Sequence, residues 1–212
     1  MKAKELWTKF KYGYYIMTHP FDGFYDLKHE HRGSLGGAHL HVLLMIIIMV
    51  CKRQLTAFVF NTNDLLAFNP LAEIGNSFVP FILWCVSNWC FTTLMDGEGT
   101  FKDVYIASAY ALTPFNIINV IAIIVSYFLT EETGSLYTLL IGIGIVWLGA
   151  LLFFGLITTH QYTFGKGLLA GILTVAGIVV MLYLGLLFCK VISNIVTFIS
   201  SLVYEFRIRF VK

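Results

Sequence analysis

Residues 136–157 read LYTLLIGIGIVWLGALLFFGLI, an apolar stretch without a single charged side chain. A helix of about 20 apolar residues crosses the ~30 Å hydrocarbon core of a bilayer, so this stretch has the length of one membrane span. Inside lipid, the backbone N–H and C=O groups must find partners within the protein, and a helix provides them locally. The stretch therefore predicts a transmembrane helix.

Outward from it, four further apolar stretches of similar length cover residues 38–60, 78–95, 104–129 and 168–189. The whole chain of 212 residues is 58% hydrophobic and 12% charged, with a mean hydropathy of +0.80. Soluble domains carry about 25% charged residues. The sequence therefore predicts an all-α, polytopic membrane helical bundle with five transmembrane helices.

The positions of the basic residues predict the orientation of this bundle. Lysines and arginines are frequent in residues 1–37, and the connections 96–103 and 158–167 each contain a lysine, whereas 61–77 and 130–135 contain no basic residue. Cytoplasmic loops carry an excess of Lys and Arg. We therefore expect an integral membrane protein with a cytoplasmic N-terminus, and five spans then leave the C-terminus outside.

Two segments beside the five stretches are amphipathic. Residues 1–37 interleave Trp7, Phe10 and Tyr12 with lysines, which predicts an interfacial N-terminal arm that contacts membrane lipids. Residues 191–212 place apolar side chains at helical spacing opposite hydroxyl and amide groups. They predict a C-terminal amphipathic helix that lies in the interface or forms a sixth span. The five-helix domain between them covers residues 38–190.

The most distinctive polar segment is DGEGTFKD, residues 96–103. Thr100 followed three residues later by Asp103 predicts a capping box at the start of the third span. The segment is either this cap alone or a cytoplasmic turn that docks a partner or binds an ion. The candidate residues are Asp96, Gly97, Glu98, Gly99, Thr100, Lys102 and Asp103.

The third stretch carries polar groups at membrane depth. Pro114 removes one helical hydrogen bond and frees a carbonyl near Tyr110. Asn116 and Asn119 share a helix face, and Asn88 of the second stretch could meet them. Such groups act as contacts between helices or line a path for a substrate or ion. The candidates are Asn88, Thr113, Pro114, Asn116 and Asn119.

Lys52 and Arg53 lie inside the first apolar stretch. A charge at the bilayer centre costs at least ~2.5 kcal/mol. Either both side chains extend to the outer interface, or they pair with a carboxylate such as Asp64.

Histidines and glycines suggest two further kinds of site. Two His-x-His pairs could bind zinc or copper through imidazole, but no cysteine completes a site, so we expect no metal and no cofactor. The candidate ligands are His29, His31, His39 and His41. Small residues permit close helix packing within the bundle or between two copies. The candidates are Gly142, Gly144, Gly149, Gly167 and Gly171.

Three segments carry a resemblance to a known family. HPFDGFYDLKHEHRGS at 19–34, LMDGEGTFKDVYIASAYALTP at 94–114 and YEFRIR at 204–209 resemble bacterial Yip-domain membrane proteins. The resemblance implies a five-span bundle in the bacterial plasma membrane, accompanying carbohydrate ABC transport systems. Eukaryotic relatives bind Rab GTPases and carry a YGY-type signature inside their helices. The Tyr12-Gly13-Tyr14 of this chain lies in the arm, so Rab binding is not implied.

Motifs of nucleotide-binding proteins, zinc proteases and serine hydrolases are absent, so no enzyme is predicted. The net charge of +2 gives no indication of nucleic-acid binding. We expect a non-catalytic accessory, scaffold or membrane-organising subunit, whose partners are lipids, other membrane proteins such as ABC transporter components, or further copies of the chain. The alternatives are a transporter or channel component with a polar path around Pro114, and a metal-handling membrane protein.

Overall fold

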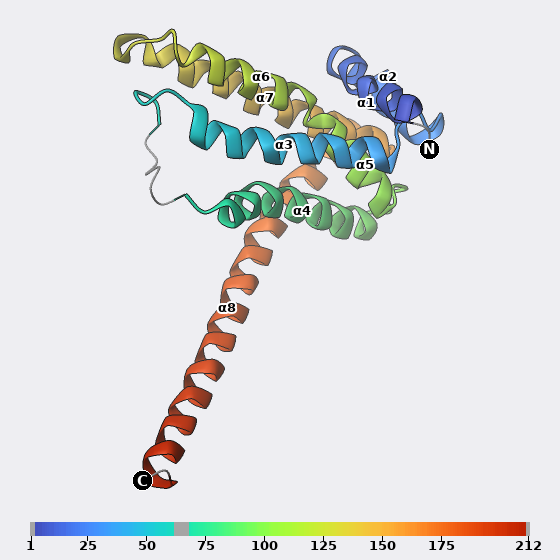
Figure 1. Cartoon of the computed structure of the whole chain (residues 1–212). Coiled ribbons are helices and arrows are strands. Elements are labelled where there is room, and N and C mark those ends of the chain that lie inside the picture. The colour runs from blue at the N-terminus through green and yellow to red at the C-terminus, as the bar shows by residue number, and fades with distance from the viewer. Residues whose placement is uncertain (1–2, 62–67, 211–212) are drawn as a thin grey trace.

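The computed structural model describes residues 3–61 and 68–210, and every regular element in these residues is a helix (Figure 1). The arm forms α1 (Ala3–Thr18) and α2 (Pro20–His29). The remaining elements are α3 (Leu35–Leu55), α4 (Pro70–Leu94), α5 (Phe101–Ala111), α6 (Thr113–Val125), the short 3-10 helix η1 (Glu131–Thr133), α7 (Gly134–His160) and α8 (Phe164–Phe210).

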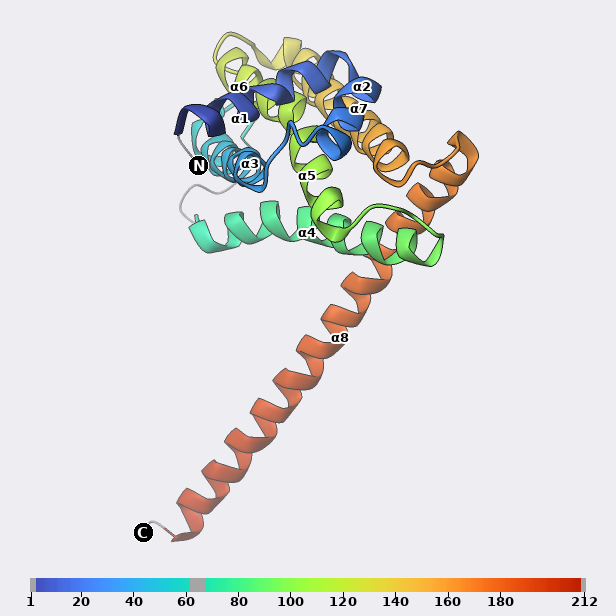
Figure 2. The same ribbon diagram turned by 90° about the vertical axis from the view of Figure 1, so that its right-hand side faces the viewer.

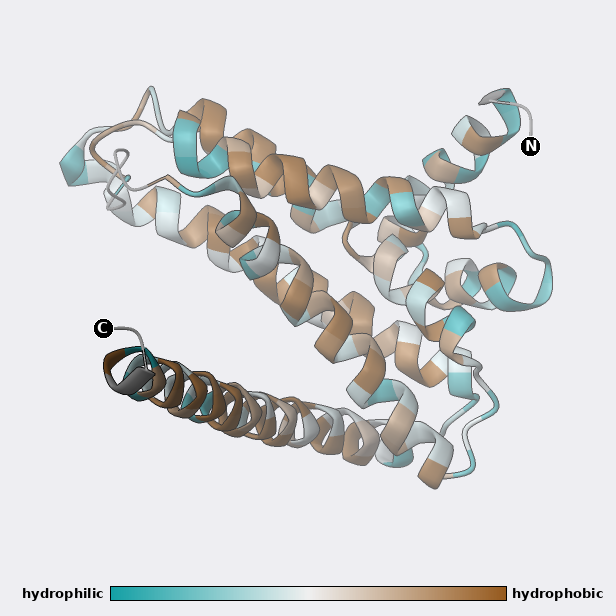
Figure 3. Ribbon diagram, turned by 60° about the horizontal axis from the view of Figure 1, so that its bottom comes forward, coloured by the Kyte–Doolittle hydropathy of each residue, from teal (hydrophilic) through white to brown (hydrophobic). Residues whose placement is uncertain are grey.

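Five helical segments of the described residues are long and apolar enough to cross a membrane, which confirms the predicted fold class. They are α3, α4, α5 with α6, α7 with η1, and α8. Figure 3 shows hydrophobic residues along these helices and hydrophilic residues in the arm and the connections. Because apolar runs of this length are local in the sequence, their positions could be predicted without tertiary information.

The ends of the first two spans differ from the prediction. The first was expected to reach residue 60, but α3 ends at Leu55, where Thr56 becomes extended and its hydroxyl donates to the Lys52 carbonyl at 2.6 Å. The second was expected from residue 78, but α4 starts at Pro70 after an Asn69 cap. The Asn69 side chain accepts hydrogen bonds from two backbone N–H groups of the first turn, which favours this earlier start.

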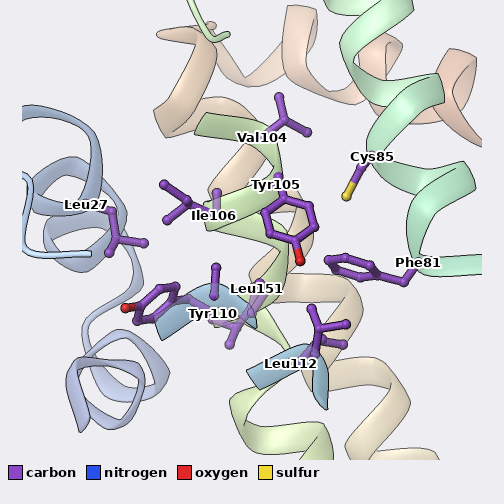
Figure 4. Packing of buried hydrophobic residues seen from close by; sticks show 14 of the residues in the cluster. Leu27, Phe81, Cys85, Val104, Tyr105, Ile106, Tyr110, Leu112 and Leu151 are labelled. Atoms are coloured by element: carbon purple, nitrogen blue, oxygen red, sulfur yellow. The ribbon is translucent and has the colours of Figure 1, made fainter. Parts of the chain in front are cut away.

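The core forms around α5, which lies at the centre of the bundle. Ala109, Tyr110 and Ala111 are fully buried there. Figure 4 shows Tyr110 and Leu112 of this region close to Leu151 of α7, and Phe81 of α4 beside the same cluster. Small and aromatic residues thus let α3, α4 and α7 approach α5 from several sides.

The arm packs on the bundle and shares its core. Ile16, Phe24 and Leu27 of the arm are buried in the same cluster as α5. The Tyr110 hydroxyl donates to the Lys9 carbonyl at 3.0 Å, which fixes α1 to α5. At Gly13 a Cβ would lie 2.5 Å from the Thr113 hydroxyl, so only glycine permits this approach. The interfacial position of the arm stays a prediction.

Helix α8 is one continuous helix that passes the predicted boundary at residue 190 without a break. Its first half contacts α4, where the Ser87 hydroxyl donates to the Thr174 carbonyl at 2.7 Å. Its second half extends away from the other helices (Figures 1 and 2). The segment 191–210 therefore continues the helix of the fifth span.

Candidate functional site

The predicted capping box is present at the start of α5. The Thr100 hydroxyl accepts from the Asp103 N–H at 3.4 Å, and the Thr100 N–H donates to Asp103 Oδ2 at 3.0 Å. Asp96, Glu98 and Lys102 are exposed beside this cap. The segment therefore has its predicted structural role, and its exposed charges are the part open to a partner.

The two glycines of the segment lie tightly against the connection that follows α7. A Cβ on Gly97 would lie 2.5 Å from His160 Nδ1 and 2.6 Å from the Tyr162 hydroxyl. The Gly99 N–H donates to His160 Nδ1 at 3.2 Å, and His160 is buried. Sequence reasoning could not predict this role for His160, because its partner lies on a different connection.

Lys28 joins the arm to both connections. Its ammonium group donates to the Thr159 carbonyl at 3.0 Å and lies 3.4 Å from Glu98 Oε2. Within the arm, the Tyr12 hydroxyl donates to Asp26 Oδ2 at 2.6 Å, and burial together with this carboxylate raises the pKa of Tyr12. The arm, the segment 96–103 and the end of α7 thus form one connected polar cluster at this end of the bundle.

The third span is divided into two helices just before Pro114. Helix α5 ends at Ala111 and α6 begins at Thr113. The Tyr110 carbonyl, which Pro114 cannot bond because it has no N–H, accepts a hydrogen bond from the Thr113 hydroxyl at 2.7 Å. The break is therefore compensated within the chain.

The three predicted asparagines lie in different surroundings. The Asn116 amide donates to the His41 carbonyl at 3.2 Å, and the Asn119 amide donates to the Phe115 carbonyl at 2.8 Å. Asn88 of α4 lines a small cavity beside His160. Asn116 lines a separate cavity with His41, so within the described residues Asn88 and Asn116 face different cavities.

Lys52 and Arg53 both make specific contacts. Lys52 Nζ donates to Asn119 Oδ1 at 2.8 Å. Arg53 Nη1 lies 2.7 Å from Glu73 Oε1, with side chains only 23% and 13% exposed. Arg53 thus pairs with a carboxylate, and its carboxylate partner within the described residues is Glu73. The suggested partner Asp64 lies outside those residues. Pairing these two partly buried charges avoids the cost of leaving either of them uncompensated.

These charged side chains line a cavity of about 610 Å³ between the spans. Along α3 the wall is apolar at Met45 and Met49 and charged at Lys52 and Arg53. Along α4 it is charged at Glu73 and apolar at Trp84. Since the two helices are antiparallel, both put their polar residues at the same end, remote from the arm. The cavity therefore has a charged mouth and an apolar interior.

The four candidate histidines have separate contacts. His39 Nδ1 lies 2.8 Å from the Tyr105 hydroxyl, His41 Nε2 lies 3.2 Å from the Phe10 carbonyl, and His29 Nε2 lies 3.2 Å from the Gln161 amide. His31 has a left-handed backbone with φ of 52° in the turn after α2. Within residues 3–61 and 68–210, no three His, Cys, Asp or Glu side chains come close enough to hold a metal ion.

The candidate packing glycines fall into two groups. A Cβ on Gly144 would lie 3.1 Å from Ile118, and one on Gly167 would lie 2.5 Å from Ile157, so these two support packing inside the bundle. Around Gly142, Gly149 and Gly171 nothing lies within 4 Å. Sequence alone could not separate the groups, because it does not show which face of a helix turns inward.

The comparisons with known proteins give one match. The model of the family described as the Yip1 domain matches residues 14–203, which is most of the chain. No curated protein matches the chain, and no solved structure matches it.

Proposed function

Because this chain belongs to the Yip1 domain family, we propose that it is a non-catalytic membrane subunit that works by assembling with another membrane-embedded protein. The Yip1 domain family consists of membrane proteins, and it is not known as a family of enzymes. A single observation carries the proposal: from Leu182 to Ile208, every residue of α8 is exposed.

Lipid alone accounts poorly for this exposed helix. With 47 residues, α8 measures about 70 Å at ~1.5 Å per residue, whereas a bilayer with its headgroups measures about 40–45 Å. The part that extends beyond the membrane would still carry apolar side chains such as Phe198, which is 67% exposed, and Ile199. Large exposed apolar patches mark interaction sites. A helix of a partner protein would cover this face.

The other exposed features agree with a role in assembly. Gly142, Gly149 and Gly171 leave shallow, open faces on α7 and α8, and such faces let a second helix approach closely. Asp96, Glu98 and Lys102 form an exposed charged group at the opposite end of the molecule from the charged cavity.

We assign this group to the cytoplasmic side, with the protein in a bacterial plasma membrane, because the basic residues cluster in the arm. The family resemblance makes a component of an ABC transport system the first partner to look for.

Photo-crosslinking tests the proposal on the full chain in its native membrane. A benzophenone amino acid replaces Phe188 or Phe198 on α8, and Phe128 in the turn after α6 serves as the matched control, since its side chain is 81% exposed. We expect both α8 positions to crosslink one protein band that co-purifies in a fixed ratio, while position 128 does not.

Mass spectrometry of the band then identifies the partner, and a tagged chain crosslinked to an untagged one identifies self-assembly. Both results support assembly through α8. Crosslinks to lipid alone, with a monomer in native mass spectrometry after mild extraction, would refute it.

A further inference from the structure

Among the described residues at its mouth, the cavity between α3 and α4 carries more positive than negative charge. Lys52 and Arg53 contribute two positive charges, and Glu73 contributes one negative charge. Glu73 pairs with Arg53 at 2.7 Å, whereas Lys52 contacts the neutral amide of Asn119 and makes no ion pair within the described residues. A partly buried ammonium group without an opposite charge is costly, and a bound anion would compensate it.

The depth of this charge matches the boundary between hydrocarbon and headgroups. Helix α3 has 21 residues and therefore a length of about 31 Å, which is close to the ~30 Å hydrocarbon thickness. Lys52 lies three residues before the end of α3 at Leu55, which is about 4–5 Å along the axis. An anion at Lys52 would thus lie where the phosphate of a lipid lies.

The interior of the cavity suits an apolar chain. Met45 and Met49 line it on α3, and Phe81 and Trp84 line it on α4. Methionine side chains adapt to irregular apolar partners. The apolar wall runs about 10 Å from Lys52 to Met45 along α3. The cavity volume of about 610 Å³ lies within the range of ligand sites, which is roughly 300–1,000 Å³.

We propose that this cavity binds an anionic amphiphile, with its phosphate group at Lys52 and Arg53 and one apolar chain between Met49 and Trp84. The proposal rests on two neighbouring features of the cavity. One is a lysine without an opposite charge at headgroup depth, and the other is a continuous apolar interior. A free phosphate would use the charged mouth and leave the apolar interior empty, so the amphiphile fits the whole cavity better. This site is independent of the assembly surface on α8.

Native mass spectrometry of the purified full chain measures the binding. The delipidated protein is mixed with phosphatidylglycerol, with zwitterionic phosphatidylcholine, or with inorganic phosphate. We expect one molecule of phosphatidylglycerol per chain, bound at least tenfold more tightly than phosphatidylcholine. Equal binding of the two lipids, or binding of inorganic phosphate as tight as that of phosphatidylglycerol, would overturn the proposal.

Variants distinguish lipid binding in this cavity from nonspecific lipid binding elsewhere on the protein. Lys52→Met removes the charge and should lower phosphatidylglycerol affinity at least tenfold, and Lys52→Arg should retain it. Lys190→Met, at an exposed lysine of α8, is the matched control and should bind as the wild type does. Met49→Trp fills the interior and should block the lipid. Unchanged affinity in both Lys52→Met and Met49→Trp would place the lipid elsewhere and refute the site.

Discussion

The contact between α4 and α8 depends on Gly177, and a single methyl group should disturb it. A Cβ at this position would overlap the ring of Phe91 and the hydroxyl of Ser87 on α4. Ser87 also donates to the Thr174 carbonyl one turn earlier on α8. In Gly177→Ala, α8 must therefore shift away from α4 or force the Phe91 ring into another position.

The size of the effect follows from two opposing contributions. Overpacking a well-packed contact costs about 1–3 kcal/mol. Replacing glycine by alanine within a helix contributes about 0.5–1 kcal/mol of stabilisation. Together they leave a net loss of up to about 2.5 kcal/mol. In a chain of this size 1 kcal/mol corresponds to about 2–4 °C, so the Tm should fall by up to about 10 °C.

Gly185→Ala is the matched control, because it changes the same residue type on the same helix where nothing lies within 4 Å. This variant should gain about 0.4–1 kcal/mol, and its Tm should rise by about 1–4 °C. Thermal unfolding in lipid nanodiscs can be followed with a thiol-reactive dye, since Cys85 of α4 is fully buried. The exposed Cys189 is replaced by serine throughout. If Gly177→Ala unfolds at the same temperature as Gly185→Ala, the described contact between α4 and α8 is wrong.

Three further predictions concern the end of the bundle that carries the arm. Asp103→Ala removes half of the capping box and should cost about 0.5–2 kcal/mol in a circular dichroism melt, whereas the exposed Lys102→Ala should leave the Tm unchanged. Gly13→Val should displace α1 and speed trypsin cleavage in the arm; cleavage at the wild-type rate would contradict the tight contact there. Since the pKa of Tyr12 is raised, its hydrogen bond to Asp26 should persist below about pH 10, the ordinary tyrosine pKa, and weaken only as the pH rises through the higher folded-state value. Trypsin resistance of the arm should therefore stay constant from neutral pH to about pH 10, and a loss near neutral pH would show that another group controls it.

The sequence by itself determined the features that depend on neighbouring residues. The uncharged run 136–157 predicts a span because hydrophobic length is a property of consecutive residues. Thr100 and Asp103 predict their capping box because both partners lie within one turn. Pro114 predicts the free carbonyl near Tyr110 because a helical hydrogen bond joins residues one turn apart.

Only the tertiary structure decided which of these helices meet, and through which faces. Arg53 pairs with Glu73 of the next span, Lys52 contacts Asn119 of the third, and the same helix packing forms the cavity that their side chains line. An apolar helix offers similar residues on every side, so its sequence does not reveal whether a glycine such as Gly144 turns inward or one such as Gly142 turns outward. Hydrophobic length is encoded locally, whereas burial and charge pairing depend on surfaces that come together only when the chain packs.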